Sequence, residues 1–269
     1  MSLVPSGERM HPTASDVETF WEHVYRYRFA CSWARGRRIL DVASGEGYGS
    51  AALRAAGAQT VMGMDIDENA AAHARERYNL EVTIGDATRM PFADGQFDLV
   101  ISFETIEHLP SPAQFLAECA RVCSPRGTVI VSTPNKDVYR DERAVNPYHI
   151  SEMSASTFAD MVRARIPGRL RLFGQVASPE IDWSFQRRTA WDERLKAGPL
   201  SRVWQALEDR THYYRRRWVE DQDRLNAVEL IAHGRDPWWT RGMNAFRVIS
   251  CPESDLSRCK YTLAVIDRM

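Results

Sequence analysis

The stretch DVASGEGYG, from Asp41 to Gly49, decides the fold of this 269-residue chain. It overlaps the apolar run RILDV (residues 38–42), which we interpret as a buried strand, and it leads into a predicted helix over residues 48–56. Three alternate positions in it are glycines: Gly45, Gly47 and Gly49. Glycine lets the backbone turn tightly and approach a ligand closely, because no Cβ is in the way. The stretch therefore predicts a strand, a ligand-binding loop and a helix in succession.

Outward from this stretch, predicted strands and helices alternate along the chain. Further strands are predicted over residues 60–65, 81–84, 97–103 and 128–133, and further helices over residues 17–33, 68–78, 112–123 and 154–165. Alternation of this kind implies right-handed crossovers and a mostly parallel sheet. Two late strands, residues 169–177 and 260–268, are expected to pair antiparallel at the sheet edge. We predict an α/β fold with seven strands, mostly parallel, in which the last strand is antiparallel.

Composition changes between residues 179 and 259, which hold six of the eight tryptophans. We interpret this segment as a mostly helical insertion that forms a substrate lid or a subunit interface, so a homodimer is one expectation. Residues 1–178 and 260–269 then form the main domain. The segment has 14 Arg or Lys against 13 Asp or Glu. Its basic run HYYRRRW (residues 212–218) is therefore interpreted as a solvated helix face rather than a nucleic-acid-binding patch.

The charge balance of the whole chain also bears on its partners. With 35 Lys or Arg and 36 Asp or Glu, the net charge is −1, so no global positive field draws the protein to nucleic acid or anionic lipid. A small-molecule or oligosaccharide acceptor fits better. The five cysteines lack zinc-site spacing, and neither a signal peptide nor an apolar run of about 18 residues is visible. We expect a cytoplasmic protein without a membrane span.

Two acidic residues indicate what the glycine loop binds. Asp65 ends the second predicted strand, where a carboxylate can accept hydrogen bonds from both hydroxyls of a ribose. Asp86, in the sequence Gly85-Asp86-Ala87 after the third strand, can accept one from an adenine amino group. The loop lacks the G-x-G-x-x-G spacing that seats a pyrophosphate on a helix N-terminus. An adenosine ligand without a pyrophosphate is favoured over a dinucleotide.

These motifs resemble those of class I S-adenosylmethionine-dependent methyltransferases, from about His23 to Pro134. The resemblance implies a Rossmann-like fold with S-adenosylmethionine as cofactor, its methionine moiety facing Asp41 and the glycine loop. Ala43 departs from the family's usual glycine, a change expected to cost little. For Arg26 two interpretations stay open, a partner of the methionine carboxylate or a surface arginine. The predicted cofactor-binding residues are Arg26, Asp41, Ala43, Gly45, Gly47, Tyr48, Gly49, Asp65, Ile66, Gly85, Asp86, Ala87 and Phe103.

A second cluster follows the fourth predicted strand, in the sequence ETIEH (residues 104–108). Glu104, Glu107 and His108, at i, i+3 and i+4, would share one face of a helical turn at the carboxyl end of the sheet. The arrangement resembles small-RNA ribose 2′-O-methyltransferases and ubiquinone-pathway O-methyltransferases, in which these residues hold a divalent cation. His149, in the sequence NPYHISE (residues 146–152), is expected to be the fourth metal ligand.

A magnesium or manganese ion there would lower the pKa of an acceptor hydroxyl and orient it for methyl transfer. Two neutral imidazoles are unusual for magnesium, which prefers oxygen ligands, so manganese, cobalt or iron are alternatives. Alternatively, His108 or His149 acts as a general base, or the cluster is positional or structural without a metal. The tryptophans and a loop of NPYH type, which resembles bacterial enzymes of glycan pathways, favour a saccharide or glycosylated metabolite. We therefore predict a metal-assisted O-methyltransferase for such an acceptor.

Three rival functions stay open on the sequence. One is a metal-independent methyltransferase for a carbon or nitrogen acceptor. Another is a small-RNA ribose methyltransferase, against which the balanced charge argues. The last is a non-catalytic cofactor-binding partner protein, against which the acidic and histidine cluster argues.

Overall fold

The structure is a computed structural model that describes residues 17–139, 148–177, 228, 231–232, 246–252, 255–256 and 259–268. Its strands are β1 (Arg38–Val42), β2 (Thr60–Asp65), β3 (Glu81–Ile84), β4 (Phe97–Ser102), β5 (Cys123–Pro134), β6 (Arg169–Ala177), β7 (Phe246–Ser250) and β8 (Tyr261–Asp267). Its helices are α1 (Val17–Cys31), α2 (Tyr48–Ala55), α3 (Glu68–Tyr78), the 3₁₀ helix η1 (Ile106–His108), α4 (Pro112–Val122), α5 (Lys136–Tyr139) and α6 (Ala155–Arg165). The predicted alternation of strands and helices is confirmed through β5.

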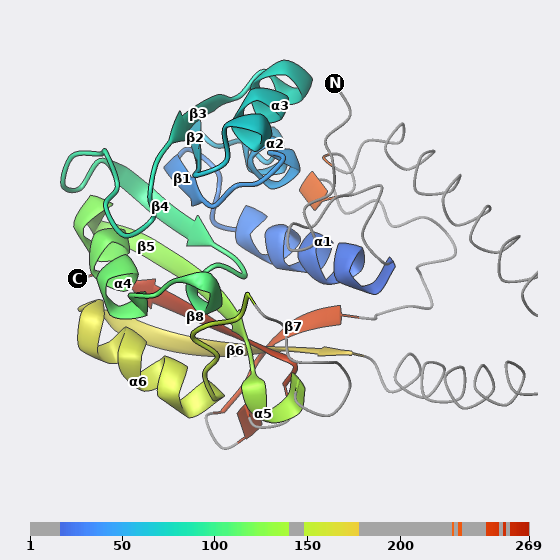
Figure 1. Cartoon of the computed structure of the whole chain (residues 1–269), viewed down its shortest axis with the longest axis vertical. Coiled ribbons are helices and arrows are strands. Elements are labelled where there is room, and N and C mark those ends of the chain that lie inside the picture. Colours follow the sequence, from blue (N-terminus) through green and yellow to red (C-terminus); the bar gives the residue numbers. More distant parts are fainter. Residues whose placement is uncertain are drawn as a thin grey trace, which may run out of the picture.

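The described strands form one sheet in the order β3-β2-β1-β4-β5-β8-β6-β7 (Figure 1). The first five of these strands pair in parallel, with β1 between β2 and β4. β8 is antiparallel to both β5 and β6, and β7 is antiparallel to β6. The carboxyl ends of β1, β2 and β4, which carry both predicted clusters, therefore lie at one edge of the sheet.

The predicted count of seven strands is wrong, because the described residues already form a sheet of eight. The additional strand is β7, whose sequence FRVIS is rich in residues that favour strands. It lies within residues 179–259, for which the overall composition predicts mostly helix. β6 and β8 do pair antiparallel as predicted, but β7 rather than either of them forms the edge. The tryptophans of that segment and the run 212–218 lie outside the described residues, so the domain division stays a prediction.

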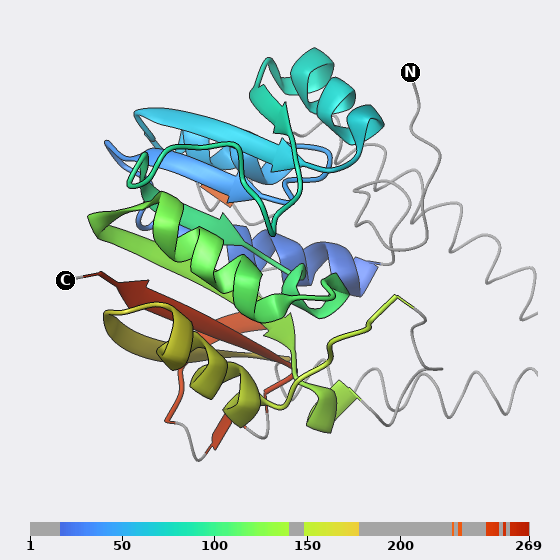
Figure 2. The ribbon, with the colours of Figure 1, turned by 60° about the vertical axis from the view of Figure 1, so that its left-hand side comes forward.

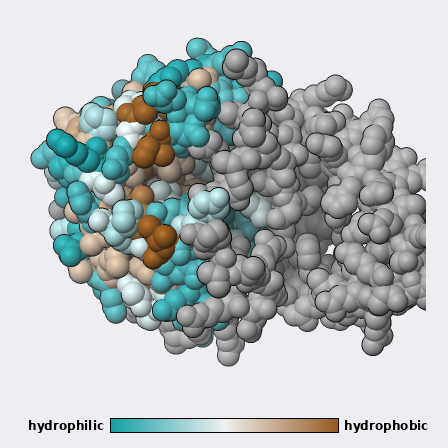
Figure 3. Space-filling view, viewed as in Figure 1, coloured by the Kyte–Doolittle hydropathy of each residue, from teal (hydrophilic) through white to brown (hydrophobic). Residues whose placement is uncertain are grey.

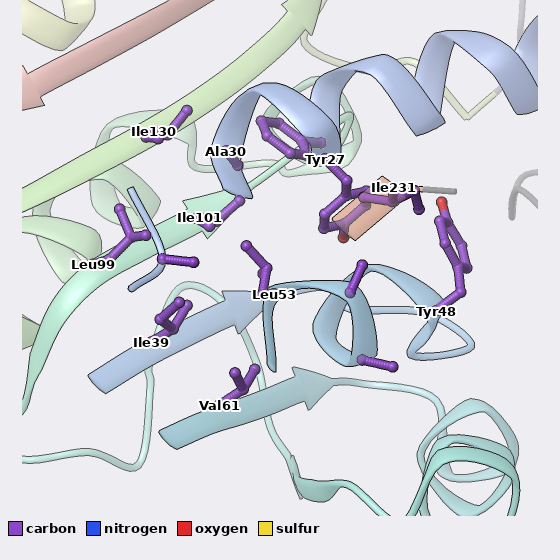
Figure 4. Packing of buried hydrophobic residues seen from close by; sticks show 14 of the residues in the cluster. Tyr27, Ala30, Ile39, Tyr48, Leu53, Val61, Leu99, Ile101, Ile130 and Ile231 are labelled. Carbon is purple, nitrogen blue, oxygen red and sulfur yellow. The ribbon is translucent and has the colours of Figure 1, made fainter. Parts of the chain in front are cut away.

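Helices cover both faces of the sheet. α1, α2 and α3 contribute to one core and α4 and α6 to the other, and Figure 2 shows α4 and α6 in front of the sheet with α1 behind it. Successive residues of β4 serve opposite cores: Leu99 and Ile101 face α1 and α2, whereas Val100 faces α4. Figure 4 shows the first core, where Tyr27, Leu53 and Ile101 converge. Central strands buried on both faces read as continuous apolar runs, which made them predictable.

The described helices include none that is both long enough and apolar enough to cross a membrane. The face seen in Figure 3 is mainly hydrophilic, with a few separate hydrophobic patches. Interspersed patches of this kind are ordinary on a folded domain, so the apolar residues near a site have to be judged individually.

Candidate active site

The glycine loop between β1 and α2 is built from alternate residues in the left-handed backbone region. Ala43, Gly45 and Gly47 have φ values of 56°, 55° and 86°. At Gly47 a Cβ would also lie 2.6 Å from the Cβ of Ala74 in α3, so glycine is needed there for packing as well. The φ of Ala43 argues against the expectation that alanine costs little at position 43, since a Cβ disfavours a left-handed conformation by roughly 1 kcal/mol.

Asp65, at the end of β2, holds this loop in place. One of its carboxylate oxygens accepts a hydrogen bond from the backbone N–H of Gly45 at 2.8 Å, and the other accepts one from that of Asp67 at 3.0 Å. A carboxylate oxygen has two lone pairs, so a carboxylate can bind the loop and accept from a ligand hydroxyl at the same time. The structure thus places Asp65 beside the loop, as the predicted ribose contact requires.

The predicted adenine contacts lie next to Asp65. Ile66 is 73% exposed, and Ile84, which is opposite Asp65 in the pairing of β2 with β3, is 43% exposed. Gly85 donates its N–H to the Asp65 carbonyl at 3.0 Å. Asp86 accepts from the backbone N–H of Thr88 at 2.7 Å, which stabilises the turn that contains Ala87. Ile84 was not predicted, although its position directly before Gly85 could have indicated it.

Asp41, at the end of β1, is completely buried. Its carboxylate accepts hydrogen bonds from Ser50 Oγ at 2.6 Å and from the Tyr27 hydroxyl at 3.1 and 3.2 Å. Burial raises the pKa of Asp41 to about 7, although the two hydroxyls lower it. Tyr27 lies outside the predicted set, and no local motif marks it, because the contact joins α1 to β1.

Arg26 is completely buried, so its interpretation as a surface arginine is wrong. Its Nη1 donates to Gln175 Oε1 at 2.7 Å, and the guanidinium lies 4.3 Å from the ring centroid of Tyr261. Its Nε and Nη2 have no hydrogen-bond partner among the described residues. Burial opposes its charge, but the negative charge of Glu104 in particular raises the pKa of Arg26. Two N–H groups of a buried cation are therefore available to an anionic ligand.

The remaining predicted cofactor residues surround this position. Tyr48 begins α2 and contacts His23 Nδ1 through its hydroxyl at 3.1 Å. Phe103, just after β4, packs edge-on against Tyr27 with ring centroids 5.1 Å apart. Residues from α1, the glycine loop and the end of β4 are thus brought together, and Asp65, Ile66 and Asp86 extend the same edge toward β3.

The ETIEH cluster does not form one helical face. Glu104 has φ 52°, a left-handed conformation that separates it from η1, and its carboxylate accepts a hydrogen bond from Ser132 Oγ at 2.6 Å. Glu107 and His108 belong to η1, and Glu107 is almost completely buried. The predicted i, i+3, i+4 arrangement is therefore wrong at its first member, because the chain turns sharply as it leaves β4.

Three residues nevertheless offer ligand atoms within 4.8 Å of one another: Glu107, His108 and His149. This is the one such group among the described residues, and Glu104 is not part of it. The segment of His149 is tied to η1, since Ser151 donates its N–H to the Glu107 carbonyl at 2.9 Å and its Oγ to the Leu109 carbonyl at 2.8 Å. The predicted fourth ligand thus does meet the cluster from a distant part of the chain.

Each of the three side chains also contacts a residue outside the group. His149 Nδ1 contacts Glu152 Oε1 at 2.8 Å, and His108 Nδ1 contacts the Tyr148 carbonyl at 3.2 Å. Glu107 Oε2 accepts from Thr133 Oγ1 at 3.4 Å, whereas its Oε1 has no hydrogen bond and lies 3.9 Å from His108 Nε2. Burial, followed by the charge of Glu104, raises the pKa of Glu107 well above its ordinary value. A cation at this position would offset both effects.

Comparison with known proteins identifies the family to which the chain belongs. Residues 40–131 match the methyltransferase domain family. A probable S-adenosylmethionine-dependent methyltransferase of Mycolicibacterium smegmatis is 34% identical over 216 residues, which cover 73% of this chain and 83% of that protein. A ubiquinone biosynthesis O-methyltransferase of Methylococcus capsulatus is 38% identical over 110 residues, covering 38% and 46% of the two chains. A fatty-acid O-methyltransferase of M. smegmatis is 29% identical over 214 residues, covering 75% and 74%.

Solved structures show the same fold at low identity. An S-adenosylmethionine-dependent methyltransferase from Thermotoga maritima has a TM-score of 0.55 and 14% identity, with 94% of this chain and 95% of that chain covered. The [4+2]-cyclase SpnF has a TM-score of 0.52 and 13% identity, with 95% and 84% covered. The fold is that of the α/β methyltransferases. On the evidence of sequence, the chain belongs to the S-adenosylmethionine-dependent methyltransferases, whose cofactor is S-adenosylmethionine.

Proposed function

We propose that this enzyme is an O-methyltransferase that uses a divalent cation to methylate a hydroxyl group of a saccharide or glycosylated metabolite. The observation that carries the proposal is the convergence of Glu107, His108 and His149 at the carboxyl end of the sheet. This is the edge at which open α/β folds bind ligands. The same edge carries the glycine loop, so the cofactor and the cluster would be neighbours.

The residues of the cluster fit a metal. Outer partners that fix a histidine through its second ring nitrogen are typical of metal centres, and His108 and His149 each have one. Glu107 Oε1 is buried without a hydrogen bond, which is costly unless a ligand is present. Two imidazoles and one carboxylate suit manganese, iron or cobalt better than magnesium. We therefore assign three protein ligands and leave Glu104, held by Ser132, outside the set.

When bound, a divalent cation lowers the pKa of a coordinated hydroxyl and so makes its oxygen a better nucleophile. The chain's own residues supply the rest. Glu107 and the two histidines would fix the acceptor relative to the cofactor. His149, paired with Glu152, is also placed to accept a proton, so a general-base role for this histidine is the alternative within the same proposal.

For the cofactor, we propose that Arg26 pairs with the methionine carboxylate and Asp41 with its ammonium group. Asp65 would then accept from the ribose, while Ile66 and Asp86 would contact the adenine. The buried, unpartnered N–H groups of Arg26 and the exposed side chain of Ile66 support this assignment. An N–H group that is buried without a partner and an apolar side chain that is exposed to water are both unfavourable, and each becomes favourable against a ligand of matching chemistry.

The acceptor is proposed from the residues that flank His149. Tyr148 is 52% exposed and Ile150 is 59% exposed, so an aromatic ring and an apolar side chain lie next to the cluster. Sugars present both vicinal hydroxyls and an apolar C–H face, and they combine chelation with stacking on an aromatic ring. Two of the relatives named above are O-methyltransferases, which favours oxygen over carbon or nitrogen as the acceptor atom.

The test is methyl transfer from labelled S-adenosylmethionine to a panel of saccharides, catechols, amines and a small-RNA duplex. We expect turnover with a hydroxylated acceptor that chelator abolishes and Mn²⁺ restores. Glu107→Gln and His149→Ala should lose turnover but keep cofactor affinity, whereas Glu76→Gln, on the exposed side of α3, should behave as wild type. Chelator-resistant transfer to an amine or carbon acceptor would establish the metal-independent alternative instead. Cofactor binding without transfer to any acceptor would establish a non-catalytic protein.

A further inference from the structure

Tyr27, in the N-terminal helix α1, contacts the cofactor motif directly. Its hydroxyl donates to the Asp41 carboxylate, 3.1 Å from Oδ1 and 3.2 Å from Oδ2. Both side chains are buried, and Asp41 comes just before the glycine loop. The segment that matches the methyltransferase domain family begins at residue 40, so α1 makes this contact from outside it.

The ring of Tyr27 is fixed in position. A Cβ at Gly49 would lie 2.1 Å from its Cζ, so α2 leaves room for this ring only because residue 49 is glycine. The ring also packs edge-on against Tyr48 and Phe103, with centroid distances of 5.6 and 5.1 Å. Contacts from α2 and from the end of β4 therefore determine where the hydroxyl lies.

The Asp41 carboxylate has no positive partner in the described part of the chain. The groups that face it are the hydroxyls of Tyr27 from α1 and Ser50 from α2, and the carboxylate of Asp65 from β2. The charge of Asp65 disfavours ionisation of Asp41. Two further titratable groups feel the charge of this carboxylate: Cys31 and Tyr48. A buried carboxylate without a cation is stabilised when a ligand brings one.

We propose that Tyr27 is a positioning residue of the cofactor site, whose hydroxyl holds Asp41 so that this carboxylate receives the α-ammonium group of S-adenosylmethionine. The proposal rests on the cofactor site proposed above and adds α1 to it. The ammonium group supplies the positive charge that Asp41 lacks. A hydrogen bond to the carboxylate favours its ionised form, so Tyr27 affects both the orientation of Asp41 and its charge.

A positioning role of Tyr27 predicts a change in the pH dependence of cofactor affinity, which a role in packing alone does not. Burial raises the pKa of Asp41 to about 7, and the hydroxyls of Ser50 and Tyr27 lower it. Burial also raises the pKa of Tyr27 well above its ordinary value, so its hydroxyl remains a donor at neutral pH. Without that hydroxyl, the pKa of Asp41 should rise further. Cofactor binding needs the ionised carboxylate, so affinity decreases as pH falls through the pKa of Asp41. Without the Tyr27 hydroxyl, this decrease should begin at a higher pH than in the wild type.

The experiment is calorimetric titration of the full chain with S-adenosylhomocysteine, from about pH 5.5 to about pH 9. Tyr27→Phe keeps the ring that contacts Tyr48 and Phe103, and thermal melting checks its fold. We expect about ten-fold weaker binding at neutral pH and a midpoint of the affinity–pH curve shifted to higher pH. Tyr78→Phe, at the end of α3, removes a hydroxyl that does not contact Asp41, and it should reproduce the wild-type curve.

A double-mutant cycle with Asp41→Asn isolates the pair and serves as the second measurement. In the Asp41→Asn background, loss of the Tyr27 hydroxyl should weaken binding much less than in the wild type. An unchanged midpoint in Tyr27→Phe, or an equal loss of affinity in both backgrounds, would overturn the proposal. These measurements need no acceptor or metal. Failure of the proposed methyl transfer would therefore leave them interpretable.

Discussion

Arg26 Nη1 donates a 2.7 Å hydrogen bond to Gln175 Oε1, joining α1 to β6 across 149 residues of sequence. Gln175 in turn donates through Nε2 to the Glu22 carbonyl at 3.0 Å, so the contact also fixes α1 one turn earlier. The side chain of Arg26 is thereby held with Nε and Nη2 free of partners among the described residues. These two N–H groups form the fork that matches a carboxylate.

Replacement of Arg26 should discriminate between ligands with and without an amino-acid tail. Arg26→Gln should weaken S-adenosylhomocysteine by roughly 10- to 100-fold, because a charge-assisted pair is lost. Methylthioadenosine, which lacks the carboxylate, should bind as it does to wild type. Calorimetry with both ligands measures this, and Arg28→Gln, on the same helix, is the matched control. Equal losses for the two ligands would mean that Arg26 acts through folding instead.

The left-handed conformation of Ala43 predicts a stabilising substitution. Ala43→Gly should raise the free energy of unfolding by about 0.5–1 kcal/mol, because glycine adopts φ 56° without a Cβ penalty. Urea unfolding measures the change. Ala51→Gly, inside α2, is the opposite control and should lower stability by about 1 kcal/mol. A destabilised Ala43→Gly would show that the methyl group has packing contacts worth more than the strain.

Ionisation of Asp41 should make stability fall as pH rises. In the unfolded chain its pKa is near the ordinary 3.8, whereas in the folded protein burial raises the pKa of Asp41 to about 7. Between these values the folded state retains a proton that the unfolded state has lost. By linkage, each pH unit in this window removes up to about 1.4 kcal/mol of stability.

Asp41→Asn should flatten that decrease, as urea unfolding at about pH 4.5 and about pH 7 would reveal. Asp98 is the control of opposite sign, because hydrogen bonds from Arg38 lower the pKa of Asp98. Its stabilising contribution is present above the ordinary value of 3.8 and is lost only as pH falls below it, so Asp98→Asn should leave the decrease between these two pH values unchanged. If wild type and Asp41→Asn changed in parallel over this window, Asp41 would have to be ionised throughout it.

Glu152 should control metal affinity without contacting the metal. Glu152→Gln weakens the contact that orients His149 through Nδ1, so we expect a 10- to 100-fold loss of Mn²⁺ affinity. Titration followed by electron paramagnetic resonance measures bound and free Mn²⁺ directly. Cofactor affinity should be unchanged, and Glu76→Gln is again the control. Wild-type Mn²⁺ affinity in Glu152→Gln would remove His149 from the proposed ligand set.

The elements that sequence predicted well are those whose signals are local. The apolar run before the glycine loop and the alternate glycines predicted β1, the turn and α2, because strand burial and positive φ each demand particular residue types. Asp65 and Asp86 could be placed for the same reason, since Asp65 ends one strand of the parallel part of the sheet and Asp86 follows another. The fold of residues 38–134 needed no long-range information beyond the crossover rule.

What could not be predicted depends on contacts between distant segments. Nothing near Glu104 shows that Ser132 will hold it, and nothing near Tyr27 shows that its hydroxyl will meet Asp41. Composition could not predict β7, because the five residues of this strand hardly change the composition of an 81-residue segment. His149 was found only through the resemblance, since a single histidine after β5 has no distinguishing local pattern.

The last residue of β6 is paired with the first residue of β7, Ala177 opposite Phe246. Two described residues of the long segment between these strands, Val228 and Ile231, belong to the first core together with Tyr27 and Leu53. Exchange of the whole segment for an unrelated one would therefore remove packing against α1 and α2. Evolution of the segment is constrained at these two positions by the same helices that border the methyl donor's site.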